Sequence, residues 1–285
     1  MVAKSMARSK IIFGLDAFIQ SSILSVTAVV SLCAWVSLTS YGYIDLVATA
    51  ALGLILFIFY TLDRALAPPE DVFQPAGGLN PGAFVGHHHR FFRKALIVAV
   101  LLLAFLIGLR PKLLFDLIGA VAVVLFYMVP VPGLAGRIKD IPYFKHVYAP
   151  LSLVAFTIIF FGIDPRQPGH CGALCGLVGL AQINTWAFDL KDIEGDRRAG
   201  IRLLAGVVPP RTYLALLACE ALLLAPVFFA VVPPSGKLGA VAAAIGNAVI
   251  LLVLRHRFSL RVLFYGLDAI AIVPLAIALL FRSRS

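Results

Sequence analysis

Charged residues are scarce in this sequence. Only 13% of its 285 residues are Asp, Glu, Lys or Arg, against roughly 25% in soluble domains, while 61% are hydrophobic. The mean hydropathy is +0.99. A soluble core does not need this much apolar surface, because a single core stops growing at about 250–300 residues. The composition therefore excludes a soluble enzyme and a disordered chain, and it indicates a membrane protein that crosses the bilayer several times.

Cysteine is also scarce, with four residues in the chain. That number is too small for a disulfide-stapled secreted domain. Cys33 and Cys219 lie inside apolar runs, and Cys171 and Cys175 are spaced by four near the start of another run. We expect four unpaired thiols that face the core or the lipid.

Acidic residues are few as well: 14 Asp and Glu stand against 24 Lys and Arg, which gives a net charge of +10. In a soluble protein this excess would indicate a nucleic-acid partner. In a membrane protein it is typical of loops that face anionic lipid, or of a site for an anionic substrate. We therefore expect membrane lipid and an anionic substrate as partners, and no nucleic acid.

Apolar runs long enough to span a bilayer account for most of the chain. A transmembrane helix needs about 20 mainly apolar residues. The triplet Arg110-Pro111-Lys112 divides one long run in two, because proline cannot continue a helix and charges at mid-depth are costly. The sequence thus predicts an all-α polytopic protein, a single transmembrane domain over 1–285. Its nine spans are 11–38, 43–62, 95–109, 113–129, 146–163, 171–188, 212–232, 238–254 and 260–281.

The basic residues test this count. With the N-terminus inside, 18 Lys and Arg fall on one side of the membrane and six on the other. The positive-inside rule then places the N-terminus and the loops after the second, fourth, sixth and eighth spans in the cytoplasm. A cell inner membrane is the expected location.

Half of the acids lie in two clusters that follow the second and sixth spans, on the same predicted side of the membrane. The first contains Asp63, Glu70 and Asp71, and the second contains Asp189, Asp192, Glu194 and Asp196. A spacing of three and four places positions 189, 192 and 196 on one stripe of a helix. Carboxylates this close repel one another unless a cation neutralises them, and oxygen ligands with phosphate favour magnesium (Mg2+).

Basic residues accompany both clusters. They are Arg64, Arg137, Lys139, Lys145, Lys191, Arg197, Arg198 and Arg202. Acids that hold a divalent cation and bases that hold phosphate oxygens together make a diphosphate site. A solvated loop of balanced charge explains the same composition, so the residues alone leave both interpretations open.

Residues 188–196, with the sequence FDLKDIEGD, and the following Gly200 resemble the second aspartate motif of the UbiA superfamily of intramembrane prenyltransferases. That family has nine transmembrane helices and an active-site cap on the cytoplasmic side, with its two acidic motifs after helices two and six. Asp63-Arg64 is similar to the middle of the family's first motif. The resemblance covers nearly the whole chain as topology, and as motifs it is confined to three loops.

The resemblance implies which residues form the site. Asp63, Asp192 and Asp196 would be catalytic. The Mg2+ ligands would be Asp63, Asp71, Asp189, Asp192 and Asp196, and the diphosphate would be bound by Arg64, Arg137, Lys139, Lys145 and Arg202. The first motif departs from the family pattern, because Phe59 and Ala67 stand where the family has Asn and Asp. Arg202-Leu203 stands where it has Lys followed by Ser or Thr. One Mg2+ held mainly by the second motif is as compatible with these residues as two.

The implied reaction is the ionisation of an allylic prenyl diphosphate and the transfer of the prenyl group to a lipophilic acceptor. Without an acceptor the allylic cation would close on its own double bonds, so a terpene cyclase is the alternative enzyme. A transporter or a non-catalytic relative is a third interpretation. It is disfavoured because the acids gather at one membrane face, whereas transporters bind near the midplane.

Several polar residues lie outside this pattern. Glu220 and Asp268 fall inside spans, where an acid either handles substrate or bonds a neighbouring helix. His87-His88-His89 is either a solvated loop or a metal-binding group. The aromatic residues Tyr41, Tyr43, Trp35 and Trp186 are typical of an interfacial belt.

Overall fold

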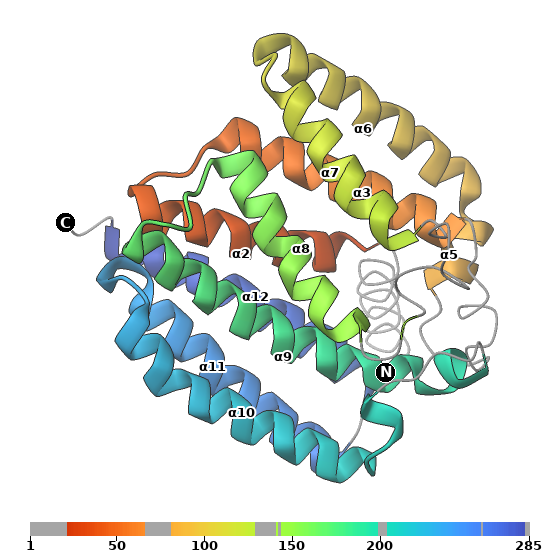
Figure 1. The fold of residues 1–285 in the computed structure, drawn as a ribbon. Helices are drawn as coiled ribbons and strands as arrows, with labels where there is room; N and C mark the ends of the chain where they lie inside the picture. The colour runs from red at the N-terminus through yellow and green to blue at the C-terminus, as the bar shows by residue number, and fades with distance from the viewer. Residues whose placement is uncertain are drawn as a thin grey trace, which may run out of the picture.

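The computed structural model describes residues 22–65, 81–128, 141, 144–198, 204–257 and 259–282. Within these ranges all regular secondary structure is helical (Figure 1). The elements are α2 (Ile23–Tyr41), α3 (Leu46–Ala65), α5 (Pro81–His87), α6 (His89–Leu109), α7 (Leu113–Met128), α8 (Phe144–Phe161), α9 (Pro168–Arg198), the 3-10 turn η2 (Leu204–Gly206), α10 (Pro210–Val231), α11 (Pro234–His256) and α12 (Leu260–Arg282).

Seven of these helices are long and apolar enough to cross a membrane: α2, α3, α6, α9, α10, α11 and the Tyr265–Arg282 part of α12. Two further apolar stretches are shorter, Leu113–Phe126 in α7 and His146–Phe161 in α8. The expectation of a polytopic helical membrane protein is confirmed. The predicted runs each overlap one of these nine helices, and the part of the first run before Ser22 lies outside the described residues.

The helix ends follow from local chemistry. The last turn of α2 is closed by Gly42, whose left-handed φ of 74° favours glycine and whose N–H bonds the carbonyl of Leu38. The predicted break at 110–112 is confirmed, since α6 ends at Leu109 and α7 begins at Leu113. Pro210 and Pro234 begin their helices at the first position, where the missing N–H costs nothing.

Two predicted loops are partly helical. Residues 81–87 form α5, and α6 starts at His89, so Arg90, Arg93 and Lys94 belong to a helix. Likewise α9 runs without a break to Arg198, although its apolar part ends at Leu190. Pattern-based boundaries failed here because both extensions are polar, and a helix that leaves the bilayer has no apolar signal.

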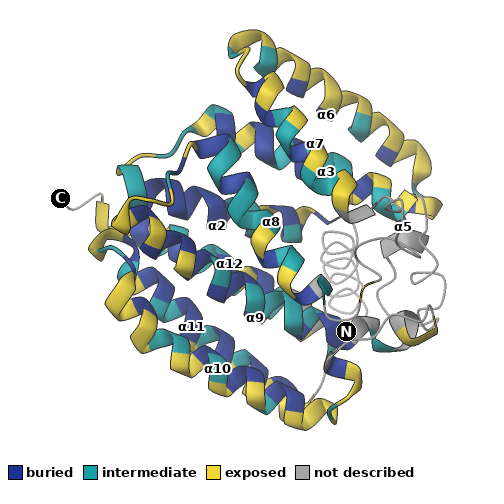
Figure 2. Cartoon of the chain, in the orientation of Figure 1, coloured by how far each residue is buried: buried dark blue, intermediate teal, exposed yellow. Residues whose placement is uncertain are grey.

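The helices form one bundle in which α9 is central. It packs against α2, α8, α10, α11 and α12, and α12 in turn packs against α2 and closes the bundle. By contrast, α6 lies at the margin, against α3, α5 and α7 (Figure 1). Figure 2 shows the same division, since the inner helices are largely buried and α6 is mostly exposed.

Glycine allows the central helices to approach closely. A Cβ on Gly172 of α9 would overlap the carbonyl oxygen of Val231 in α10, and one on Gly239 of α11 would lie 2.7 Å from the carbonyl oxygen of Pro274 in α12. Small residues are the usual means of helix contact in membranes, because lipid gives no hydrophobic force between apolar helices.

Trp35 is fully buried, so its assignment to an interfacial belt is wrong. Its ring fills the space left by glycine: a Cβ on Gly176 would lie 2.8 Å from the ring, and one on Gly236 would lie 2.9 Å from the indole nitrogen. The sequence pattern could not show this, because two distant glycines create the slot.

Chain direction alternates along the bundle. One end of the bundle, where α3 and α9 terminate and α6 and α10 begin, is called the acidic end. The other end contains residues 42–45, 110–112 and 162–167 and is called the opposite end. Segments from several helices meet at the acidic end: Leu24, at the start of α2, packs against Phe188 of α9 and Tyr265 of α12.

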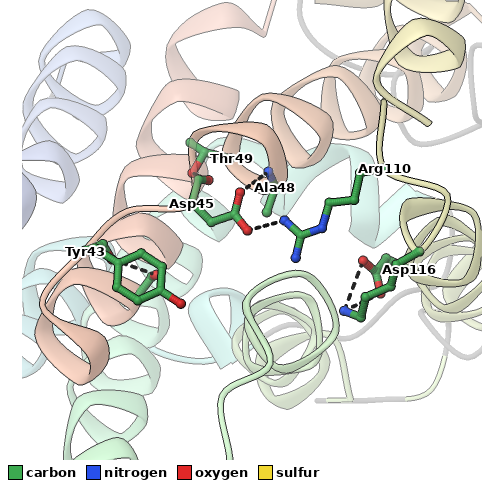
Figure 3. Close-up of polar contacts among 8 residues, drawn as sticks. Tyr43, Asp45, Ala48, Thr49, Arg110 and Asp116 are labelled. Carbon is green, nitrogen blue, oxygen red and sulfur yellow. Dashed lines mark hydrogen bonds and ion pairs between the residues drawn. The ribbon is translucent and has the colours of Figure 1, made fainter. Parts of the chain in front are cut away.

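At the opposite end an ion pair joins two loops (Figure 3). The guanidinium of Arg110 bonds the carboxylate of Asp45, which also accepts the N–H of Ala48 at 2.9 Å. Partial burial works to raise the pKa of Asp45, but these two donors outweigh it and hold the pKa below its usual value. A second pair links Lys112 to Asp116 at 3.2 Å.

Candidate functional site

A buried histidine and a buried aspartate meet at the acidic end. Asp189, in the last apolar turn of α9, has its Oδ2 atom 2.7 Å from Nδ1 of His146 in α8. The side chains are 1% and 4% exposed. A carboxylate this buried needs a cation or a strong hydrogen-bond donor. The imidazole of His146 is the group that faces this carboxylate at ion-pair distance.

Aromatic residues hold this pair in place. The indole N–H of Trp186 donates to the carbonyl of His146 at 3.2 Å, and its ring stands edge-on to the imidazole. The hydroxyl of Tyr213, in α10, donates to the carbonyl of Trp186 at 3.1 Å. Trp186 therefore belongs to an interhelical network, and these bonds fix α8, α9 and α10 relative to one another.

A second polar group surrounds the end of α3. Asp268 of α12 is 4% exposed, and it accepts a hydrogen bond from Oγ of Ser25 at 2.9 Å. Asp63 and Arg64 lie in the last turn of α3, and Asp268 lies in the third turn of α12, which begins at the same end. The acid inside α12 thus lies at the same end of the bundle as the Asp63-Arg64 motif.

Both acids inside spans bond a neighbouring helix. Asp268 is bonded by Ser25 of α2, and Glu220 of α10 accepts a 2.7 Å hydrogen bond from the amide of Gln182 in α9. The hydrogen-bond interpretation is therefore confirmed for each. Asp268 nevertheless lies at the same end of the bundle as Asp63.

The second acidic motif lies on a helix, as its spacing predicts. Positions 189, 192 and 196 all belong to α9, which is 31 residues long. Asp189 is the last acid within the apolar span, and positions 192 and 196 lie in the extension beyond it. The backbone therefore brings the motif out of the apolar part of the bundle at the acidic end.

The structure describes the side chains of three predicted site residues, Asp63, Arg64 and Asp189. Asp63 and Arg64 are half-buried in the last turn of α3, where the helix dipole favours the cation. Lys145, Asp192 and Asp196 are placed by their helices only, and Asp71, Arg137, Lys139 and Arg202 lie outside the described residues.

Mg2+ is bound by oxygen ligands, mainly carboxylates and phosphates. Among the side chains that are described, no three His, Cys, Asp or Glu form a group able to hold a metal ion. Asp63 has the right chemistry and is accessible. Asp189 is buried, and its Oδ2 atom lies 2.7 Å from the imidazole Nδ1 of His146. The predicted metal ligands at positions 192 and 196 lie on the α9 extension, where the structure describes the backbone only.

Sequence reasoning missed His146 and Ser25. A single histidine at the start of an apolar run carries no motif, and serine is common in spans. The free state of all four cysteines was predicted and is confirmed, with Cys33 buried and the others exposed.

The histidine triplet lies at the junction of α5 and α6 rather than in a loop. His87 and His89 are exposed, and His88 packs its ring against Phe84 at 4.6 Å.

Comparison with known proteins adds no assignment to these observations: no protein-family model, curated protein or solved structure matches the chain.

Proposed function

We propose that this protein is a Mg2+-dependent intramembrane prenyltransferase of the UbiA type, which ionises an allylic prenyl diphosphate and transfers the prenyl group to a lipophilic acceptor. The observation that carries the proposal is the presence of two separate acidic motifs at the same end of an apolar helical bundle. Asp63-Arg64 ends α3, and α9 carries positions 189, 192 and 196 to the same end.

The proposal includes a topology. All nine apolar helices would span the membrane, with the shorter α7 and α8 completing the family's number. The N-terminus and the acidic end would face the cytoplasm of a cell inner membrane. The bias of 18 basic residues against six supports this orientation.

The proposed roles follow from chemistry and position. Asp63, Asp192 and Asp196 would hold the metal, while Arg64 and the basic residues predicted from the sequence would bind the diphosphate oxygens. Bound Mg2+ would supply electrostatic stabilisation of the leaving diphosphate. The His146–Asp189 pair would keep the end of α9 in place. The prenyl chain would lie among apolar helices, where aromatic faces stabilise an allylic cation.

The decisive experiment supplies the purified protein with Mg2+ and allylic diphosphates of ten to twenty carbons, with and without a lipophilic acceptor. We expect pyrophosphate release that depends on the acceptor, because a cation without a nucleophile would be lost to water or elimination. A cyclic hydrocarbon or alcohol formed equally fast without acceptor would replace the transferase with a cyclase. No turnover with these donors or with longer polyprenyl donors would contradict both.

A further inference from the structure

A second group of cations lies at the acidic end, on α6. Arg90, Arg93 and Lys94 occupy the first two turns of α6, and all three are exposed. Within the described residues, no hydrogen bond or ion pair is recorded for any of them. The sequence contains no Asp or Glu between Asp71 and Asp116. These cations therefore form a positive patch whose own helix carries no acid.

The register of α6 directs this patch away from the bundle. Positions 90, 94, 97 and 101 share one stripe of the helix. On that stripe, Ile97 is 54% and Leu101 is 64% exposed. The buried residues Phe92, Ala99 and Leu103 lie on the other side of α6, which packs against α3. The cations thus continue the surface that an α6 span exposes to lipid.

Depth along α6 also matters. Arg90 precedes Ile97 by seven residues, which is about 10 Å of helix. Apolar side chains that face lipid begin at Ile97, so the cations lie at about the level of the headgroups. Phe91, which is 65% exposed, lies beside Arg90, and aromatic side chains are enriched at this depth.

The junction that carries the patch is packed. Phe84 of α5 contacts His88 at 4.6 Å and Phe92 at 6.0 Å between ring centroids. Val85 is 4% exposed, and α5 packs against α3 as well as α6. The first turns of α6 are therefore held against the bundle, and the three cations project from a fixed base.

We propose that Arg90, Arg93 and Lys94 form a binding site for the phosphate headgroup of an anionic phospholipid. Guanidinium groups pair with phosphate oxygens through two parallel hydrogen bonds, and basic residues next to a span attract anionic lipid. The acyl chains of the same lipid would lie along the exposed stripe of Ile97 and Leu101. This inference does not depend on the proposed enzymatic function.

The test uses the full-length protein in detergent, with phosphatidylglycerol and phosphatidylcholine of identical acyl chains added in equal amounts. Native mass spectrometry counts the bound lipids. We expect the wild-type protein to retain phosphatidylglycerol preferentially, and Arg90→Gln/Arg93→Gln/Lys94→Gln to lower that retention by about tenfold. The charge-keeping variant Arg90→Lys/Arg93→Lys should retain most of it.

A location control removes cations from the same end of another helix. Arg255 and Arg257 are exposed at the end of α11, so Arg255→Gln/Arg257→Gln should change retention by less than twofold. Equal retention of the two lipids by the wild type would overturn the proposal, as would an equal loss in this control. Because all the substituted side chains are exposed, unfolding temperatures within a few degrees of wild type will show that the variants fold.

Discussion

Helices α6 and α9 are both long enough to cross a membrane, yet they occupy opposite situations. Half of the α9 span is buried inside the protein, against 17% of α6. The more apolar helix is the one at the margin. Helix α9 carries glycines, Gln182, Asn184 and Asp189, and it lies at the centre. In a bilayer, apolar side chains are equally well placed against lipid, whereas close backbone approach and polar side chains require protein partners.

The same comparison separates two kinds of charge at the acidic end. On α9 the buried carboxylate is matched by His146, and the network continues through Trp186 to α10. On α6 the cations are exposed and point away from the bundle. Charge on the central helix is therefore matched within the protein, whereas the charges at the start of the marginal helix are exposed. The predictions that follow test this division.

The largest effect is expected on activity. Asp63→Asn and Asp192→Asn should each lower turnover by about 100- to 1,000-fold while the protein stays folded, because each removes charge without changing volume. The assay is pyrophosphate release with a prenyl diphosphate and acceptor. Asp164→Asn is the matched control at the opposite end, where the side chain only accepts the N–H of Arg166. An equal loss in the control would mean that the acidic end has no special role.

The next effect is on stability. His146→Leu leaves the carboxylate of Asp189 buried without its imidazole partner, and it should lower the free energy of unfolding by about 3–5 kcal/mol. His89→Leu makes the same substitution on exposed α6 and should change it by less than about 0.5 kcal/mol. Reversible unfolding in mixed micelles measures both. Similar values for the two variants would contradict the difference between the helices.

A smaller loss of stability is expected when a glycine between two helices is replaced. Gly172→Ala should cost about 1–3 kcal/mol, because the new methyl group forces α9 away from the backbone of α10. Gly108→Ala on α6 meets open space and should be neutral or slightly stabilising, since alanine is the better helix former. Unfolding temperatures of the pair, measured in the same detergent, give the comparison. A cost at Gly108 equal to that at Gly172 would show that α6 is packed as tightly as α9.

The smallest effect concerns pH at the opposite end. The pKa of Asp45 is lowered in the folded protein, so its contribution to stability is present above the unfolded pKa and is lost as the pH falls through the folded pKa. We expect a loss of at most about 1 kcal/mol below about pH 4, because the Arg110 pair is partly exposed. Asp45→Asn should remove this part of the pH dependence, whereas Asp189→Asn should not.

Much of the architecture was predictable from the chain. Runs of apolar residues located the membrane helices, proline and charge at 110–112 located a break, and spacing by three and four predicted that Asp189 and its neighbours lie on a helix. These features depend on local properties, since a span must satisfy its own backbone hydrogen bonds and bury about 20 apolar residues in lipid. The polar extensions of α6 and α9 were missed, because helix outside the bilayer has no such pattern.

The site was predictable only in part, and its partners show why. Asp63 and Asp189 could be chosen because acids are rare in this chain, but nothing in the pattern links Asp189 to His146 or Asp268 to Ser25. Each pair joins two different helices: His146 and Asp189 lie on the consecutive helices α8 and α9, and 243 positions separate Ser25 from Asp268. Trp35 was misplaced for the same reason, since its slot is made by Gly176 and Gly236.

Composition and order along the chain thus determine that this is a polytopic helical protein and which end of each helix carries charge, because those properties depend on each segment and its solvent. Which helix is central, which acid is matched by a histidine and which cations stay exposed depend on packing between segments. Lipid does not sort apolar helices by hydropathy, so small residues and polar contacts between helices decide where each one lies.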